Sequence, residues 1–229
     1  MSIYAIRNGL RTWAQINPAD YGWGARPFPV ILTPDHKRGV YAIPRCGSVS
    51  LILAMAEAHY PKAAEALRSA MACSEPWIHP ELAYRLAEEH GMMKTDLPEN
   101  VECYAVIRHP ISRAASALQF MTSPQMIHAK VNGMPTAKNE ILLFLTRSAP
   151  QMVDVHFRPY FIGLRENVTR VFRMEDGGMQ EVANLLGLEI GRENKTEDKH
   201  HLDLWQQMFV ANMYAADCRL WDAVIQGAE

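Results

Sequence analysis

Three short apolar segments, each followed by a stretch with helical spacing, constrain the fold of this chain more than any other feature. The segments are GVYAIP (39–44), VECYAVIR (101–108) and VTRVFRME (168–175), and they are typical of buried strands. Strands that alternate with helices predict an α/β fold, in which helices cover both faces of a parallel sheet. Ligands in such folds bind at the carboxyl ends of the strands, so the loops at 44–50 and 108–116 are expected at the functional edge.

Helical segments fill much of the sequence between and after these strands. Pro61 separates the first two segments, and Gly91 is well placed to end the third. We expect helices at residues 48–59, 62–72, 80–91, 110–121, 139–149, 179–188 and 204–225.

The chain is expected to form a single domain with three parts. Residues 1–38 contain four prolines and are expected to be an irregular N-terminal extension. Residues 39–176 are expected to form a nucleotide-binding α/β core, and residues 177–229 a helical C-terminal region. At 229 residues, of which 48% are hydrophobic, the chain is long enough to bury a sizeable core.

The composition argues against several classes of protein. A net charge of −2 gives no general attraction to nucleic acid. The four cysteines form no CxxC pair and have no zinc-ligand spacing, so free thiols in a reducing compartment are expected. No apolar run has the length of a signal peptide or a membrane span. We therefore expect a soluble, cytoplasmic protein without a metal ion or a nucleic-acid partner, and the sequence gives no indication of its oligomeric state.

The loop IPRCGSVSL (43–51) has the composition of a phosphate-binding turn. Gly47 allows the backbone to approach a phosphate closely, and the helix that follows presents amide donors and the positive end of its dipole. Ser48 and Ser50 add hydroxyl donors, and Arg45 adds a cation that can bind two oxygens at once. The alternative is an ordinary strand-to-helix turn with a serine cap.

Two familiar kinds of phosphate loop do not match this stretch. The pattern G-x-x-x-x-G-K-[ST] of nucleoside-triphosphate sites is absent. A cysteine phosphatase loop that began at Cys46 would need an arginine where Ile52 stands. A small-molecule or nucleoside kinase with a degenerate loop remains an alternative, although the sequence offers no clear aspartate for magnesium.

A second loop, VIRHPISRAASALQF (106–120), also has polar residues at the end of a strand. The strand delivers Arg108 to the sheet edge, and Pro110 suits the first turn of the next helix. Arg113 and Ser116 lie three residues apart and share one helical face. Arg108 and Ser116 are therefore placed to converge on a second phosphate. The alternative is that Arg108 pairs with a carboxylate and Ser116 only packs.

These loops resemble two elements of the sulfotransferases that use 3′-phosphoadenosine-5′-phosphosulfate (PAPS). IPRCGSVSL is similar to their 5′-phosphosulfate loop, which usually reads proline-lysine-x-glycine-threonine-threonine-serine. VIRHPISRAASALQF is similar to their 3′-phosphate element, an arginine-x-proline followed by an arginine and a serine. Three further stretches resemble the branch that contains the carbohydrate sulfotransferases. They are DVHFRP (154–159), ENKTED (193–198) and MYAADCRLW (213–221), and all five stretches occur in family order.

The resemblance implies a P-loop-like three-layer fold and a PAPS-dependent transfer of a sulfonate group. The acceptor would be a hydroxyl of a carbohydrate, a glycolipid or a small metabolite, and adenosine 3′,5′-bisphosphate (PAP) would be released without a metal ion. Two separated sites suit a nucleotide with phosphates at its 5′ and 3′ positions, whereas a triphosphate needs one contiguous cradle. The residues that the resemblance assigns to PAPS are Arg45, Cys46, Gly47, Ser48, Val49 and Ser50 for the 5′-phosphosulfate, and Arg108 and Ser116 for the 3′-phosphate.

The resemblance also implies catalytic residues, with one departure from the family. Arg45 stands where the family has lysine; it can neutralise charge on the leaving phosphate but hardly donates a proton. His79, in a proline-flanked loop before the second element, is the expected base, and an ordinary loop histidine is the alternative. His156 and Arg158 are expected to organise the site. Arg45 also favours another alternative, a homologue that binds the nucleotide without turnover.

Overall fold

The structure, a computed structural model, divides into two compact units. The sheet unit takes its described residues from Pro27–Ile107 and Glu166–Lys195, and the helical unit takes its described residues from Arg108–Arg165 and Thr196–Glu229. The boundaries of these units differ from those of the three expected parts. The chain leaves the sheet unit after residue 107 and returns to it at residue 166. The described residues are 27–75, 78–97, 100–123, 137–147, 155–165, 167–191 and 201–225.

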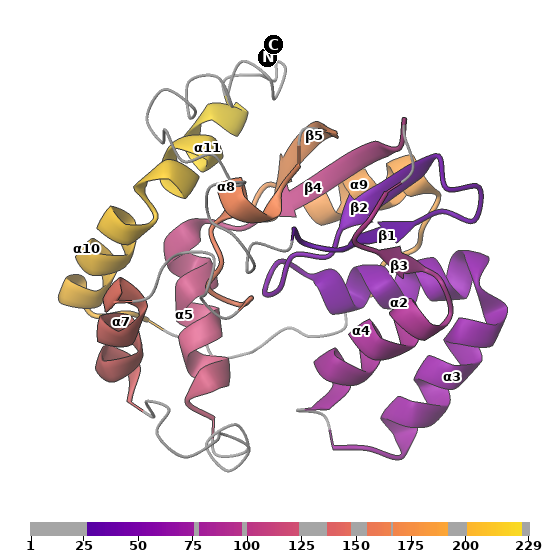
Figure 1. Cartoon of the computed structure of the whole chain (residues 1–229), viewed down its shortest axis with the longest axis horizontal. Helices are drawn as coiled ribbons and strands as arrows, with labels where there is room; N and C mark the ends of the chain where they lie inside the picture. The colour runs from indigo at the N-terminus through magenta and orange to yellow at the C-terminus, as the bar shows by residue number, and fades with distance from the viewer. Residues whose placement is uncertain are drawn as a thin grey trace. The chain divides into compact units, whose positions relative to one another are not determined.

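The sheet unit is built on a five-stranded mixed sheet in the order β3-β1-β2-β4-β5 (Figure 1). The α/β class is therefore confirmed. The expectation of a parallel sheet is correct for β2, β4 and β5, whereas β1 runs antiparallel to both of its neighbours. The strands are β1 (Val30–Leu32), β2 (Arg38–Tyr41), β3 (Met93–Lys94), β4 (Glu102–Ile107) and β5 (Val168–Arg173).

The antiparallel strand β1 lies in the stretch that was expected to be irregular, so this expectation is wrong for residues 30–32. A tight turn joins β1 to β2, with the Thr33 N–H donating to the Arg38 carbonyl over 2.9 Å. The Thr33 hydroxyl donates to the Asp35 carboxylate over 2.7 Å and holds the turn closed. Pro34 lies inside this turn. Proline is common both in hairpin turns and in irregular segments, so it does not distinguish them.

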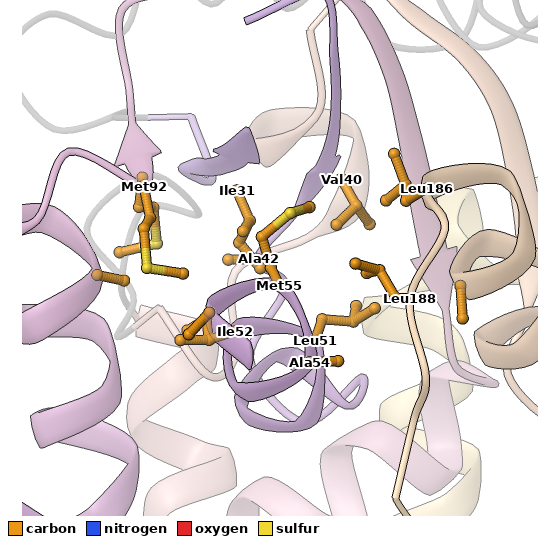
Figure 2. Packing of buried hydrophobic residues seen from close by; sticks show 14 of the residues in the cluster. Ile31, Val40, Ala42, Leu51, Ile52, Ala54, Met55, Met92, Leu186 and Leu188 are labelled. Carbon is orange, nitrogen blue, oxygen red and sulfur yellow. The ribbon is translucent and has the colours of Figure 1, made fainter. Parts of the chain in front are cut away.

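The core of the sheet unit lies between one face of the sheet and four helices, α2 (Ser48–His59), α3 (Pro61–Ala72), α4 (His79–Glu89) and α9 (Gly178–Leu186). Figure 2 shows side chains of α2 directed at those of β1 and β2, with Met92 on one side and the end of α9 on the other. Burial of each large apolar side chain stabilises the unit by about 1.5–3 kcal/mol. The labelled residues are Ile31, Val40, Ala42, Leu51, Ile52, Ala54, Met55, Met92, Leu186 and Leu188, all buried.

The helical unit has its own apolar core, in which α5 contacts α7 and α10 (Figure 1). Leu118 of α5, Leu142 of α7 and Val210 of α10 are fully buried there. The described helices of this unit are α5 (Pro110–Met121), α7 (Lys138–Arg147), α8 (Tyr160–Gly163), α10 (Leu204–Met213) and α11 (Ala215–Ile225).

Residues 204–225 form two helices rather than the single one expected. The break falls at Tyr214, whose φ of −105° and ψ of 29° end α10. The hydroxyl of Tyr214 is buried and donates to the Phe157 carbonyl over 2.6 Å. This tertiary contact has no signature in a helical pattern. By contrast, α2 and α5 occupy the residues expected for them.

Candidate functional site

The loop between β2 and α2 contains two residues in the left-handed region. Gly47 has φ 79° and ψ 14°, and Arg45 has φ 67°. Left-handed backbone costs a residue with a side chain about 1–2 kcal/mol. Between them, the Cys46 N–H donates to the Ile43 carbonyl over 3.1 Å. Turns with alternating backbone handedness form small concavities lined by N–H groups, which suit anions.

The first turn of α2 begins without a cap from a side chain. The first helical hydrogen bond joins the Leu51 N–H to the Gly47 carbonyl at 3.1 Å. The amides of Ser48, Val49 and Ser50 therefore precede the helical hydrogen bonds and lie at the positive end of the helix dipole. This start offers the donors that an anion requires.

The side chains of the loop are less available than the sequence suggests. Cys46 and Ser48 are buried, with 2% and 4% of their surfaces exposed, whereas Arg45 and Ser50 are partly exposed. The expected contribution of Ser48 through its hydroxyl is therefore restricted by burial. Backbone amides, Arg45 and Ser50 are the groups that this loop can present to a ligand.

A methionine from another helix packs on the loop glycine. A Cβ atom at Gly47 would lie 2.6 Å from both the Sδ and the Cε of Met179, which belongs to the first turn of α9. Gly47 therefore has two roles: it adopts the left-handed conformation, and it leaves room for the Met179 side chain. The start of α9 therefore lies beside the start of α2, a juxtaposition that sequence reasoning missed.

The start of α9 repeats the backbone of the start of α2. Gly177 has φ 86° and ψ 11°, and α9 also has no side-chain cap. Arg173 ends β5 just before this turn, with its side chain 4% exposed and paired with Asp176 at 3.3 Å. The burial of this guanidinium rules out a position on a solvated face. The Gly177–Gly178 pair after a strand is the signal that would have found this second turn.

In the helical unit, the backbone of Arg108 is held by one tyrosine. The Tyr160 hydroxyl donates to the Arg108 carbonyl over 2.7 Å and accepts from the Arg108 N–H over 3.1 Å. The Arg108 side chain is partly exposed, as is Ser116 two turns along α5. Arg108 and Ser116 therefore remain accessible, and Tyr160 was not identified from the sequence.

Arg113, which shares a helical face with Ser116, has a structural role. Its side chain is 3% exposed and donates to the carbonyls of Arg158 and Val155 over 2.7 and 3.3 Å. The guanidinium also lies 4.7 Å from the centre of the Tyr160 ring. Arg113 therefore fixes the 155–160 segment to α5.

The closing helix fixes the same segment from another side. Both carboxylate oxygens of Asp217 accept from the Tyr160 N–H, at 3.0 and 2.9 Å. Burial raises the pKa of the Asp217 carboxyl to about 7, although the Tyr160 N–H, the charge of Arg113 and the Phe161 N–H act in the opposite direction. Burial also raises the pKa of the Tyr214 hydroxyl. The second, third and fifth family-like stretches therefore meet through hydrogen bonds in the helical unit.

In the helix after Arg108, a side chain caps one of the first amides. The Nδ1 atom of His109 accepts from the Ile111 N–H over 3.3 Å, and the ring contacts Trp221 at 4.7 Å between centroids. A group that caps a helix satisfies one of its orphan donors. An anion beside Arg108 would therefore depend on side chains more than on helix amides.

His79, the expected base, begins α4 in the sheet unit. Its Nε2 atom lies 3.1 Å from the Met71 carbonyl and 3.3 Å from the Ser74 carbonyl. Carbonyl oxygens only accept, so Nε2 carries the proton in the neutral ring and Nδ1 carries the lone pair. Within the described part of the chain, Nδ1 has no hydrogen-bond partner.

The remaining predicted site residues lie in the helical unit or outside the described residues. His156 is partly exposed and stacks on Phe120, with 4.9 Å between ring centroids. Arg158 is partly exposed and offers its carbonyl to Arg113. Asp154 and the ENKTED segment lie outside the described residues.

The two predicted phosphate elements belong to different units of the chain. Residues 45–50 lie in the sheet unit, and Arg108 and Ser116 lie in the helical unit. Among the described residues, no group of three His, Cys, Asp or Glu side chains is placed to hold a metal ion. No helix of the described ranges has both the length and the hydropathy of a membrane crossing.

Comparisons with protein-family models, with curated proteins and with solved structures find no match for this chain.

Proposed function

We propose that this chain is a PAPS-dependent sulfotransferase that transfers a sulfonate group to a hydroxyl of a carbohydrate, glycolipid or small metabolite. The start of α2 carries the proposal. At the carboxyl end of β2, two left-handed residues precede three amides outside the helical hydrogen bonds. The same residues resemble the 5′-phosphosulfate loop of the family. The P-loop-like three-layer fold is part of this proposal.

The 5′-phosphosulfate would be held by the backbone more than by side chains. The side chains of Cys46 and Ser48 are buried. The donors are therefore the amides of Ser48 and Val49, the amide and hydroxyl of Ser50, and the Arg45 guanidinium. Cys46 supports the turn through its bond to the Ile43 carbonyl. Arg45 would stabilise negative charge on the leaving phosphate as the sulfur–oxygen bond breaks.

The 3′-phosphate would be held by Arg108 and Ser116. Tyr160 supports this role, because its two hydrogen bonds fix the backbone from which the Arg108 side chain extends. His156 and Arg158 are proposed to organise the acceptor side.

His79 is the proposed base. Its Nε2–H is directed at two carbonyls, so Nδ1 is left to take the acceptor's hydroxyl proton as the new oxygen–sulfur bond forms. Orientation of one ring nitrogen by a fixed acceptor is a common arrangement for histidine bases.

A nucleotide-binding protein without turnover is the second candidate, and Arg45 favours it. Arginine in place of the family lysine hardly donates a proton, and here it also adopts φ 67°. Replacement Arg45→Lys should raise transfer in a weakened enzyme. Absence of transfer in both forms, with PAP still bound, would support the second candidate.

The test is a thermal-shift titration with PAP and, separately, with ATP and magnesium. At about one hundred times its dissociation constant, PAP should add about 2.7 kcal/mol of stability. The shift should be lost in Arg108→Ala and kept in Arg85→Ala, an exposed arginine on α4. A shift with ATP and magnesium alone would favour a kinase and contradict the proposal. The absence of a shift with either ligand would also contradict the proposal.

A further inference from the structure

A cavity of about 300 Å³ lies in the sheet unit between α2, α3 and the segment that follows α9. This volume is at the small end of the range for ligand sites. The wall is partly apolar and partly charged. Its principal residues are Ser50, Leu53 and Glu57 from α2, Arg68 and Met71 from α3, and Glu189 from the segment after α9.

The cavity lies beside the first turn of α2, and one of its lining residues contacts the proposed base. Ser50 belongs to the first turn of α2, where the 5′-phosphosulfate is proposed to bind. Met71 of α3 also lines the cavity, and its carbonyl is 3.1 Å from the Nε2 atom of His79. An acceptor in this cavity would therefore lie beside the phosphate loop and would contact Met71, whose carbonyl orients the proposed base.

The charges of the wall favour one kind of ligand. Glu57 and Arg68 face each other at 3.6 Å, so their charges largely cancel. Glu189 is exposed on the segment after α9, and it has no ion pair within the described ranges. The wall therefore carries a net charge of about −1, which attracts a cation and repels an anion.

The apolar part of the wall limits the size and shape of the ligand. Leu53 and Met71 are partly exposed and face the space from two helices. A hydrocarbon ring can pack on them, and methionine adapts its shape to such a ring. The space suits one small ring with a few polar substituents.

We infer that this cavity is an acceptor site for a small hydroxylated molecule that is neutral or carries an amine, such as a cyclic amino alcohol. The role as acceptor site rests on the proposed sulfotransferase function, whereas the preference for a cation rests on the wall alone. Anionic acceptors are disfavoured by the net negative charge that Glu189 gives the wall.

The preference is tested with three probes of equal size and different charge. They are trans-4-aminocyclohexanol, cyclohexane-1,4-diol and trans-4-hydroxycyclohexanecarboxylate, titrated by ligand-observed NMR at low ionic strength. The amine should bind most tightly and the carboxylate least. Glu189→Gln and Glu57→Gln should each weaken amine binding roughly two- to fivefold, the range for exposed charge pairs. Glu89→Gln, which removes a similarly exposed glutamate paired with Arg85, is the matched control and should change nothing.

Equal binding of the three probes, absence of binding, or equal effects of Glu189→Gln and Glu89→Gln would overturn the inference. The acceptor role is tested separately by PAP release from PAPS with the amine probe present. Release that depends on the probe and falls in Glu189→Gln supports it. Binding of the amine without release, in protein that binds PAP, overturns the acceptor role and leaves the donor site intact. Failure of PAP to bind overturns the proposed function itself, while the charge preference is still decided by the probes.

Discussion

The two units of this molecule begin their helices in different ways. In the sheet unit, α2 and α9 follow Gly47 and Gly177, both left-handed, and neither helix has a side-chain cap. In the helical unit, α5 is capped by His109 and α10 by Asp203, and the first amide of α8 donates to Asp217. In the helical unit, α5, α8 and α10 each give one of their first amides to a side chain, whereas α2 and α9 of the sheet unit do not.

This difference separates two kinds of anion site. A helix start with its own acceptor has fewer donors left for a ligand, whereas a glycine start leaves them exposed or open to another partner. It follows that the proposed 5′-phosphosulfate site rests on backbone amides, and the proposed 3′-phosphate site on the side chains of Arg108 and Ser116. The two glycine starts also differ from each other, because Met179 packs on Gly47 whereas a Cβ at Gly177 would meet nothing within 4 Å.

The largest expected effect concerns the glycine that begins α9. A Cβ at Gly178 would lie 2.5 Å from the Arg173 carbonyl oxygen and 2.7 Å from the Phe172 Cβ, and the backbone there cannot move cheaply. We expect Gly178→Ala to lower the free energy of unfolding by about 3 kcal/mol or more, measured by urea denaturation. A loss below that for Gly177→Ala would show that α9 does not pack closely on β5.

A smaller loss of stability is expected at the two left-handed glycines, Gly47 and Gly177, and it should differ between them. Gly47→Ala combines backbone strain with displacement of Met179 and should cost about 2 kcal/mol, whereas Gly177→Ala meets strain alone and should cost about 1 kcal/mol. The double variant Gly47→Ala with Met179→Ala should recover part of the difference. Only the Gly47 change should weaken PAP binding. Equal losses of unfolding free energy and equal PAP affinities in the two variants would contradict a difference between these turns.

A further difference between the units is a pH dependence that arises from Asp217 in the helical unit. A carboxyl whose pKa is raised by folding keeps its proton where the unfolded chain has lost it. The free energy of unfolding should therefore fall as pH rises from 3.8, the ordinary value, to about 7 for Asp217. The slope from this group approaches about 1.4 kcal/mol per pH unit, and Asp217→Asn should remove it. Urea denaturation at several pH values measures this, and an unchanged slope in the variant would contradict it.

The local pattern of the sequence predicted the helices and central strands well. Apolar spacing placed α2 and α5 at their observed residues, because each buries one continuous face. It missed β1 because a proline-containing turn resembles an irregular segment. It joined α10 and α11 because the contact of Tyr214 with Phe157 is tertiary.

The candidate site was predictable only where its signal is local. Gly47 and Arg108 stand at strand ends and are visible from spacing. Burial of Ser48, and packing of Met179 on Gly47, depend on how α2 and α9 meet, and no single segment encodes that. Asp217 was part of a family-like stretch, but its bond to the Tyr160 amide required the folded unit.

We propose that the glycine start of α2, rather than the capped start of α5, gives its amides to a phosphate. Amide chemical shifts in a ¹H–¹⁵N titration with PAP test this most directly. We predict large, saturable shifts at the amides of Gly47, Ser48, Val49 and Ser50, and little change at Ile111, whose N–H already donates to His109. Shifts at Ile111 without shifts at residues 47–50 would contradict the account.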